Sequence, residues 1–508
     1  MARFVDGIKF TNIFDLKIVS LLSFFYQYSS MLINKVTLFF VFILMLINPA
    51  FSQYESNYFS PLSKDAYAQK ITEIKARKIV KRYEDKDEQK YFESVVKLRN
   101  ESLQKSLEDN SIIHDTLLLN RCNLILEKIK KANPTFNHEG VQFFIYRSLT
   151  PNAGSLGDGS FYVNLGLFLV IENEDEMAMV LGHELAHYFL QHFEKRIDNN
   201  IRLLSSKDFK DEFKAIKKAD DGKYLRFRKL MKEISTKGGA HSRFKESEAD
   251  SLGVLLITKA GYNKNTAAKV LLNLEYSDDF YARNNLYDCK ASLENKIPEN
   301  YFAVSKRKYN GLSTVEVTMN ADADFDSIRT HPDCKSRYFR ITNVSDTNKI
   351  VCCAAISKND ELFKTRALLE SARTLYEYEN FSMLIHLSLF AKKSGYDNLV
   401  FNVYQSLAFS GIVKAERELR RFSVTNAGAA PNTTLKTLQE VIFKLSKEDL
   451  LMLSEEFLKN NELGKEDDDF AMMQFRIELT PLNEAGLKTA FSNRYPKSKY
   501  LYLLNKPL

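Results

Sequence analysis

The pattern of hydrophobic and polar positions predicts a mainly helical chain with a small β-sheet. Residues 63–131 are highly charged, and their apolar side chains recur at the three- and four-residue spacing of one helix face. Asn133-Pro134 interrupts this pattern. Residues 141–146 are rich in β-branched and aromatic side chains, which predicts a strand. After a glycine-rich turn signal at 157–159, residues 160–164 predict a returning strand.

Helices are predicted for most of the remaining chain. One covers 173–195 and is capped by its first residue, an asparagine. The charged stretch 196–237 predicts exposed helical pieces, which Gly238-Gly239 should break, and a serine should cap a further helix over 242–261. Residues 263–350 have no clear pattern. Helical patterns return at 360–377, 380–393, 396–410, 432–460 and 483–491. Stacked helical hairpins and an irregular helical domain explain that spacing equally well.

The charge pattern argues against a nucleic-acid partner. The chain's 72 Lys and Arg and 65 Asp and Glu are interleaved and leave a net charge of +7. No long basic block and no basic stripe interleaved with aromatic residues is present. We therefore expect a solvated, mixed-charge surface and no nucleic-acid binding.

A segment near the N-terminus has the pattern of an export signal. Lys35 precedes an apolar run over 36–47, and small residues precede a cleavage site between Ser52 and Gln53. The run is too short to span a bilayer comfortably. We expect cleavage and export to the periplasm or the cell exterior. A retained membrane anchor is the alternative, because 18–26 is also apolar; membrane association is thus possible but not required.

The cysteines offer no metal site of their own. The five are Cys122, Cys289, Cys334, Cys352 and Cys353, and none belongs to a CxxC pair. An exported protein can form disulfides, but the spacing leaves their pairing open.

The most informative motif is His183-Glu184-Leu185-Ala186-His187, an HExxH sequence inside a predicted helix. Positions i and i+4 lie on one helix face, so the imidazoles of His183 and His187 can bind one Zn²⁺. Zinc lowers the pKa of bound water to about 7, and Glu184 is suited to accept the proton. The motif predicts one zinc ion per chain.

Zinc in a catalytic site needs a third protein ligand. Glu246 and Asp250 share a helix face, so Glu246 can bind the metal while Asp250 orients a ligating imidazole through its other nitrogen. Glu248 points about 200° away from Glu246 and is interpreted as a solvated charge. His241 is the rival ligand, but it precedes the predicted helix.

These motifs together resemble the gluzincin zinc metallopeptidase family that includes the CAAX prenyl protease, the heat-shock protease HtpX and the periplasmic protease BepA. The resemblance covers about residues 110–345. Its matching positions are Asn152-Ala153, Gly159 to Leu167, Gly182 to His187, Ser242, Arg243, Glu246, Glu248, Ala249, Asp250, Gly253, Thr330-His331-Pro332 and Arg337.

The resemblance implies roles for individual residues. Glu246 would be the third zinc ligand and Asp250 would support the site. His331 would be a transition-state hydrogen-bond donor or a gating ligand, although a helix-start histidine without a catalytic part is equally compatible. Ala153, Gly154 and Ser155 would form an edge strand that pairs with extended substrate backbone. His192 is left out because i+5 from His187 lies off the ligand face.

The chain departs from the family pattern in two places. Glycines and Asp158 replace a more apolar stretch near 154–158, which can alter substrate choice. The charged segment between His187 and Glu246 is long, and it is either a lid or partner surface or, more simply, a solvated spacer.

The expected fold is α+β and mainly helical, with a zincin peptidase domain that contains the small sheet. The expected divisions are an extension and signal peptide at 1–52, a helical segment at 53–109, the peptidase domain at 110–350 and a helical domain, either repeat-like or irregular, at 351–508.

The expected activity is zinc-dependent hydrolysis of peptide bonds in proteins or peptides, in quality control or envelope assembly. The alternative is a chaperone-like assembly factor that binds client or envelope proteins through its C-terminal helices, with rare or gated proteolysis. A catalytically inactive zinc scaffold is disfavoured because every catalytic position is present.

Overall fold

The computed structural model describes residues 63–136, 140–219, 221–274, 297, 301, 334–343, 358–396, 399–425, 433–459 and 465–504. The expected export signal and His331 lie outside these residues. The described residues belong to one compact unit, Phe59–Leu508. Within them, no helix combines the length and apolar character needed to cross a bilayer.

Four strands form the sheet. They are β1 (Ile112–Ile113), β2 (Gln142–Tyr146), β3 (Ala153–Ser155) and β4 (Ser160–Asn164), in the order β1-β2-β4-β3. The two predicted strands are therefore confirmed as β2 and β4. They run parallel, however, and β4 returns along β3 instead. The residues expected to form an edge strand are β3, which lies at one end of the sheet.

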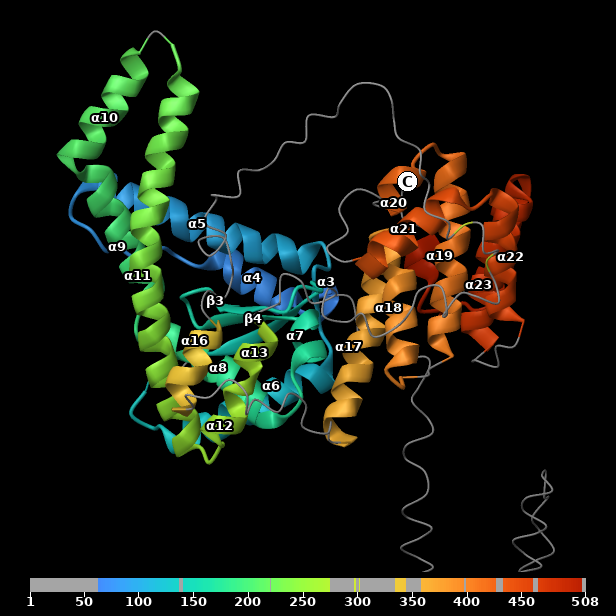
Figure 1. Ribbon diagram of the computed structural model, residues 1–508, viewed down its shortest axis with the longest axis horizontal. Helices are drawn as coiled ribbons and strands as arrows, with labels where there is room; N and C mark the ends of the chain where they lie inside the picture. Colours follow the sequence, from blue (N-terminus) through green and yellow to red (C-terminus); the bar gives the residue numbers. More distant parts are fainter. Residues whose placement is uncertain are drawn as a thin grey trace, which may run out of the picture. The chain divides into compact units, whose positions relative to one another are not determined.

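Helices cover both faces of this sheet (Figure 1). Side chains alternate along β2, so Phe144 packs with Ile74 and Leu107 on one face while Phe143 and Ile145 join the main core on the other. The first face is covered by α4 (Ala68–Ala76) and α5 (Lys86–Glu108), and α3 (Ser63–Ala66) packs against these two helices. The main core contains α6 (Thr116–Ala132), α7 (Leu165–Val170) and α8 (Glu174–Phe189).

The predicted helix over 173–195 is wrong at its end. Helix α8 stops at Phe189, Gln191 adopts a left-handed conformation with φ of 55°, and α9 (His192–Ser205) begins at the next residue. No glycine or proline marks this break, so the sequence pattern runs through it unchanged.

The predicted break at Gly238-Gly239 is also wrong, and so is the serine cap at 242. After α10 (Lys207–Lys218), helix α11 runs without interruption over Lys223–Lys259. A glycine inside a helix costs only about 0.5–1 kcal/mol relative to alanine and removes no backbone hydrogen bond. Packing of α11 against α8 at one end and α10 at the other can offset that cost.

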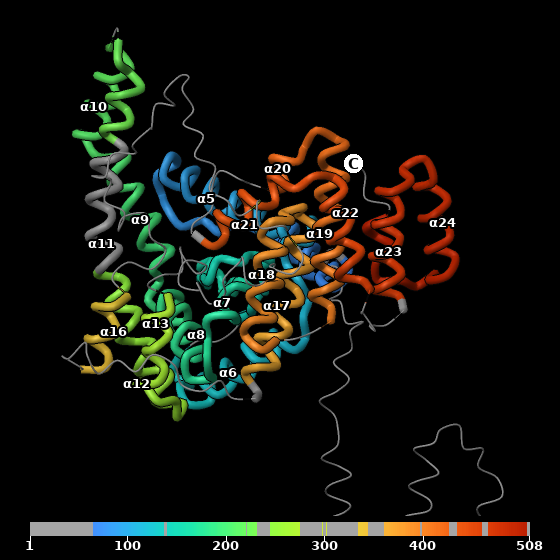
Figure 2. Tube along the Cα trace, turned by 45° about the vertical axis from the view of Figure 1, so that its right-hand side comes forward, coloured from blue at the N-terminus to red at the C-terminus, as the bar shows by residue number. Residues whose placement is uncertain are grey.

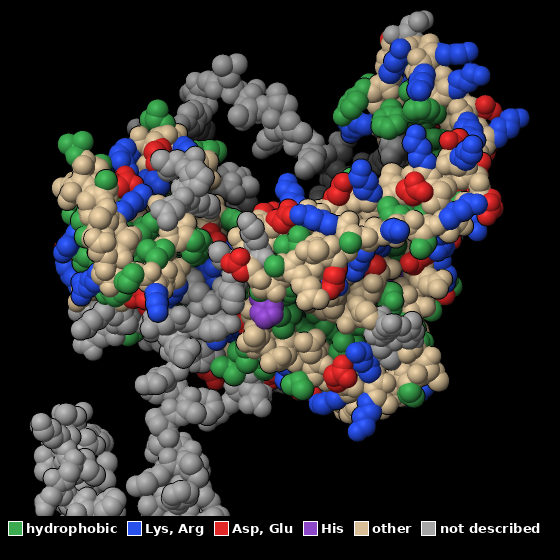
Figure 3. Space-filling model, turned by 180° about the vertical axis from the view of Figure 1, so that it is seen from behind, with side chains coloured by type: hydrophobic (Ala, Val, Ile, Leu, Met, Phe, Trp, Pro, Cys, Tyr) green, Lys and Arg blue, Asp and Glu red, His purple; other side chains and the backbone are tan. Residues whose placement is uncertain are grey.

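The long segment between the two sequence motifs is helical in pieces, as expected. It forms α9, α10 and the first part of α11, which project together in Figure 1. Lys and Arg surround a group of hydrophobic side chains on this projection (Figure 3), and Tyr224 and Leu225 are 71% and 67% exposed. The domain closes with α12 (Lys264–Ala267), α13 (Lys269–Leu274) and α16 (Cys334–Thr342).

The C-terminal region is helical, as predicted. Its elements are α17 (Lys358–Glu377), α18 (Phe381–Lys393), α19 (Val400–Arg417), α20 (Arg421–Thr425), α21 (Thr433–Lys444), α22 (Lys447–Leu458), α23 (Lys465–Leu479), η5 (Pro481–Asn483), α24 (Glu484–Arg494) and α25 (Leu501–Leu504), which Figure 2 traces. The single helix expected over 432–460 is two helices, because Ser446 and Asp449 form a capping box that starts α22.

The C-terminal helices share a core with the rest of the described chain. Helix α17 packs on α7, and Arg121 on α6 lies 2.7 Å from Asp360 at the start of α17. Arg147, which follows β2, is buried and donates a 2.5 Å hydrogen bond to Glu377. Removing α17 would therefore expose apolar surface and take away the Glu377 carboxylate that pairs with Arg147.

Candidate metal centre

Helix α8 holds both histidines of the HExxH motif. Asn173 caps it by accepting a hydrogen bond from the Glu176 backbone N–H, and Glu176 accepts one from Glu172 N–H. Acidic residues in the first turn complement the helix dipole. The helix is buried from Glu176 to Ala186, so its position is fixed by packing. One turn apart on its surface, His183 Nε2 and His187 Nε2 lie 3.0 Å from each other.

Helix α11 carries the third predicted ligand, Glu246, and it approaches α8 closely. A Cβ atom on Gly253 would lie 3.0 Å from the His183 backbone nitrogen, and one on Gly182 would lie 2.6 Å from Ile257. Only glycine permits this contact without displacement of one helix. Seven residues before Gly253, about two helical turns away, Glu246 then faces the two imidazoles.

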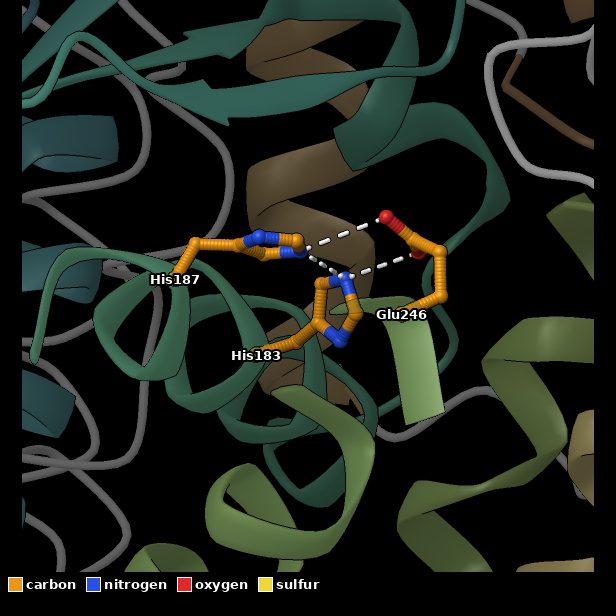
Figure 4. A group of neighbouring side chains, drawn as sticks. All are labelled: His183, His187 and Glu246. Atoms are coloured by element: carbon orange, nitrogen blue, oxygen red, sulfur yellow. Dashed lines mark hydrogen bonds and ion pairs between the residues drawn. The ribbon is translucent and has the colours of Figure 1, made fainter. Parts of the chain in front are cut away.

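The three predicted ligands converge (Figure 4). Glu246 Oε2 lies 3.3 Å from His183 Nε2, and Glu246 Oε1 lies 3.4 Å from His187 Nε2. In a tetrahedral site with ligands about 2.05 Å from zinc, ligand atoms are about 3.3 Å apart. The observed separations fit that value, so the donor set and its spacing suit Zn²⁺. Among the described residues, His183, His187 and Glu246 are the group able to hold a metal ion.

Asp250 and Arg337 support this group from one side. Asp250 Oδ1 lies 3.1 Å from His183 Nδ1, the ring nitrogen that faces away from Glu246. Arg337, on α16, is buried and donates to both Asp250 oxygens at 2.7 and 2.8 Å. Its Nη1 also lies 3.1 Å from Glu246 Oε2. Asp250 thus faces the second nitrogen of a predicted ligand, as the sequence suggested. The sequence did not predict the contacts of Arg337 with Asp250 and Glu246.

Comparison with known proteins agrees with this geometry. Residues 122–345 match the sequence model of peptidase family M48. These residues therefore form a domain similar to peptidase family M48. The resemblance expected from the motifs is therefore confirmed, since this is the family of HtpX, the CAAX protease and BepA. This match indicates a zinc metalloendopeptidase that acts on peptides or proteins. No curated protein matches the chain.

The M48 site favours positive charge when no metal is bound. Burial lowers the pKa of His183, but hydrogen bonds to Asp250 and Glu246 outweigh it and raise that pKa to about 10. Burial raises the pKa of Asp250, but His183 and Arg337 lower it to about 2. The pKa of Glu246 is lowered more strongly still. Burial raises it, but hydrogen bonds to His183 and His187 outweigh burial. The pKa of each carboxyl is therefore low enough to keep it ionised, and a bound cation would replace the proton on His183.

His187 has a different partner, which the sequence reasoning missed. His192 Nδ1 lies 2.8 Å from His187 Nδ1, and His192 Nε2 lies 3.5 Å from Glu248 Oε2. The i+5 spacing excludes such a contact only if one helix continues through both residues. The turn at Gln191 breaks that helix and places the side chain of His192 in contact with that of His187. Glu248, interpreted from the sequence as a solvated charge, is partly exposed and lies beside His192.

The remaining predicted residues that the structure describes lie in or against the same helix. Glu184 is buried in α8 next to His183. Strand β3 packs on α8, and its Gly154 pairs in register with Tyr162. A Cβ on Gly154 would lie within 2.3–2.5 Å of the Tyr162 ring, so glycine leaves room for that ring beside the edge strand. Burial, and next the charge of Glu184, raises the pKa of Tyr162 to about 12.

Proposed function

We propose that this zinc metalloendopeptidase is exported to the periplasm or cell exterior and cleaves proteins there, in quality control or envelope assembly. The convergence of His183, His187 and Glu246 at zinc-like spacing carries the catalytic part of the proposal. The export part rests on the charged, apolar and small-residue pattern before Gln53.

Zinc, when bound, would polarise the scissile carbonyl and make water more acidic. Glu184 is the proposed general base: it takes a proton from the attacking water and delivers it to the leaving amine nitrogen. Asp250 keeps the His183 ring in one orientation and tautomer through Nδ1. His331 is the proposed hydrogen-bond donor to the transition state, or alternatively a residue that gates the site.

The proposed substrate path runs along β3. This strand ends the sheet, and its outer side is unpaired among the described residues. An extended peptide can add to such an edge through backbone hydrogen bonds, with side-chain pockets setting specificity. Residues 153–155 would then align the scissile bond beside α8, against which the strand packs.

Metal content and hydrolysis test the proposal together. Residues 53–508 should bind one zinc per chain, and Glu246→Ala should lose it or hold it much more weakly. Glu184→Gln should keep the metal and lose hydrolysis of an unfolded protein substrate. Absence of zinc from the wild-type protein, or full activity of Glu184→Gln, would contradict the catalytic proposal. Mass spectrometry of the mature N-terminus, expected at Gln53, tests export separately.

A second candidate function, client binding, is supported by one feature of the C-terminal helices. A cavity of about 800 Å³ opens there, with walls that combine apolar side chains such as Phe381 and Ile477 with charged ones such as Lys414 and Glu478. A volume of 300–1,000 Å³ is typical of ligand sites. Such a mixed lining suits a peptide segment that carries both apolar and charged groups.

Variants separate the two functions. If protection of clients is the main role, Glu184→Gln should restore a deletion strain while Lys414→Glu with Lys488→Glu should not. If proteolysis is the main role, the outcomes should reverse. These substitutions are preferable to removing the region after residue 355, because α17 packs against the peptidase domain.

A further inference from the structure

The two zinc-binding imidazoles differ in what holds their second ring nitrogen. His183 Nδ1 faces a carboxylate oxygen of Asp250 at 3.1 Å, and that carboxylate is neutralised by Arg337. His187 Nδ1 instead faces another imidazole, that of His192, at 2.8 Å. Ligating histidines usually donate this N–H to a carboxylate, a carbonyl or water. An imidazole in that position is therefore unusual, and its role needs a separate explanation.

The tautomers of this pair follow from metal binding. A neutral His187 that binds the metal through Nε2 must carry its proton on Nδ1. It therefore donates, and His192 Nδ1 must accept. The proton of a neutral His192 is then on Nε2. That atom is buried and makes no hydrogen bond among the described residues, while Glu248 Oε2 lies 3.5 Å away.

The backbone holds His192 in place at some cost. Gln191 adopts φ of 55°, a left-handed conformation that residues with a side chain rarely adopt. The turn lets α9 begin at His192, whose side chain is only 5% exposed. Lys245, next to the ligand Glu246, donates a 3.3 Å hydrogen bond to the His192 carbonyl. The ligand helix α11 and the start of α9 are thus tied together at this residue.

We propose that His192 is a positioning residue for the zinc ligand His187, acting as a neutral acceptor for its Nδ1–H. This hydrogen bond fixes the plane of the His187 ring with Nε2 aimed at Glu246 and His183. Because the acceptor is neutral, it adds no negative charge to a centre that already contains Glu246. The inference rests on the zinc site proposed above and adds a residue to its support.

Replacement of the acceptor tests this role through the metal itself. His192→Phe keeps a ring but cannot accept, whereas His192→Asn offers a neutral amide oxygen. Chelator competition should show zinc binding weakened about 10–100-fold in His192→Phe, the range typical of lost supporting contacts to metal ligands, and substantially restored in His192→Asn. The visible absorption of the Co²⁺-substituted proteins should change in His192→Phe and return toward wild type in His192→Asn.

His114→Phe is the matched control, since His114 is half-buried and contacts the Tyr67 ring. Equal zinc affinity and equal Co²⁺ spectra in wild type and His192→Phe would overturn the inference while leaving the zinc site intact. Absence of zinc from the wild-type protein would instead refute the proposed function. If His192→Phe fails to fold, histidine ¹H–¹⁵N correlations of the zinc-loaded wild type decide: protonation of His192 at Nε2 supports the role, and protonation at Nδ1 contradicts it.

Discussion

Gly253 on α11 lies directly against the backbone of His183 on α8, where a Cβ atom would come within 3.0 Å of the His183 nitrogen. The same close approach involves Gly182, over which Ile257 and the Gly253 carbonyl pack. This contact sets how far Glu246 stands from the two histidines. The metal site therefore depends on a glycine that contributes no ligand.

Gly253→Ala should move α11 away from α8. The added methyl meets backbone on the other helix, which cannot rotate aside, so overpacking should lower the free energy of unfolding by about 1–3 kcal/mol. The separation of Glu246 from His183 should grow as well, and zinc affinity should fall. Urea unfolding of the metal-free protein and chelator competition measure the two effects. Ser251→Ala, on the exposed face of the same helix, is the control, and unchanged zinc affinity in Gly253→Ala would contradict the argument.

Arg337→Leu should lower the free energy of unfolding more than loss of a surface ion pair does. It would leave the carboxylate of Asp250, which is 2% exposed, without the guanidinium group that pairs with it. Glu246 would then lie near an uncompensated negative charge. Breaking a buried pair from one side costs about 3–5 kcal/mol. Arg337→Lys should recover only part of this, because lysine cannot donate to both Asp250 oxygens in a fixed fork. Thermal unfolding of both variants, beside the exposed control Lys335→Leu, tests this order of stability.

Sequence patterns predicted part of the candidate site because two of its residue pairs depend on local features. A capped helix places His183 and His187 on one face whatever surrounds it, and Glu246 and Asp250 share a face for the same reason. Local patterns could not assign a role to Arg337, because its contact with Asp250 joins residues that are 87 positions apart. Only tertiary packing brings α16, which carries Arg337, next to Asp250.

The two wrong helix boundaries have a common physical origin. Local propensity suggested a break at Gly238-Gly239 and continuity through Gln191, and packing reversed both. Helix α11 gains enough contacts with α8 and α10 to include two glycines. Gln191 adopts a conformation that its residue type disfavours. That second error hid the contact of His192 with His187, because the i+5 argument assumed one continuous helix.

The metal-free protein should lose stability as the pH rises above neutrality. His183 has a folded-state pKa of about 10 and an ordinary value of 6.5. A raised pKa stabilises the fold fully below about pH 6.5, and the stabilisation is lost as pH rises toward 10. Asp250, with a pKa lowered to about 2, contributes above its ordinary pKa of 3.8 and loses that contribution as pH falls toward 2. Stability from this pair should therefore be greatest between about pH 4 and 6.5.

Thermal unfolding in a chelator from pH 5 to 10 tests this dependence. The unfolding temperature should fall on the alkaline side in the wild type and much less in Asp250→Asn, which lacks the charge that raises the His183 pKa. Zinc-loaded protein should not show the same fall, because its His183 is already neutral. Zinc binding should strengthen over the same pH range, since fewer protons have to leave. An alkaline profile that is identical in wild type and Asp250→Asn would count against this assignment.

The edge strand offers a test of substrate binding that barely touches stability. In Gly154→Ala the new methyl would occupy the space of the Tyr162 ring, whose far end can swing aside, so the free energy of unfolding should fall by less than about 1 kcal/mol. The displaced ring should alter the surface beside β3 and raise KM for peptide substrates, with zinc content unchanged. Tyr162→Phe, which keeps the ring and removes the hydroxyl, separates ring position from hydrogen bonding. If Gly154→Ala cleaves a peptide series with wild-type KM and preference, β3 is not the strand along which substrate binds.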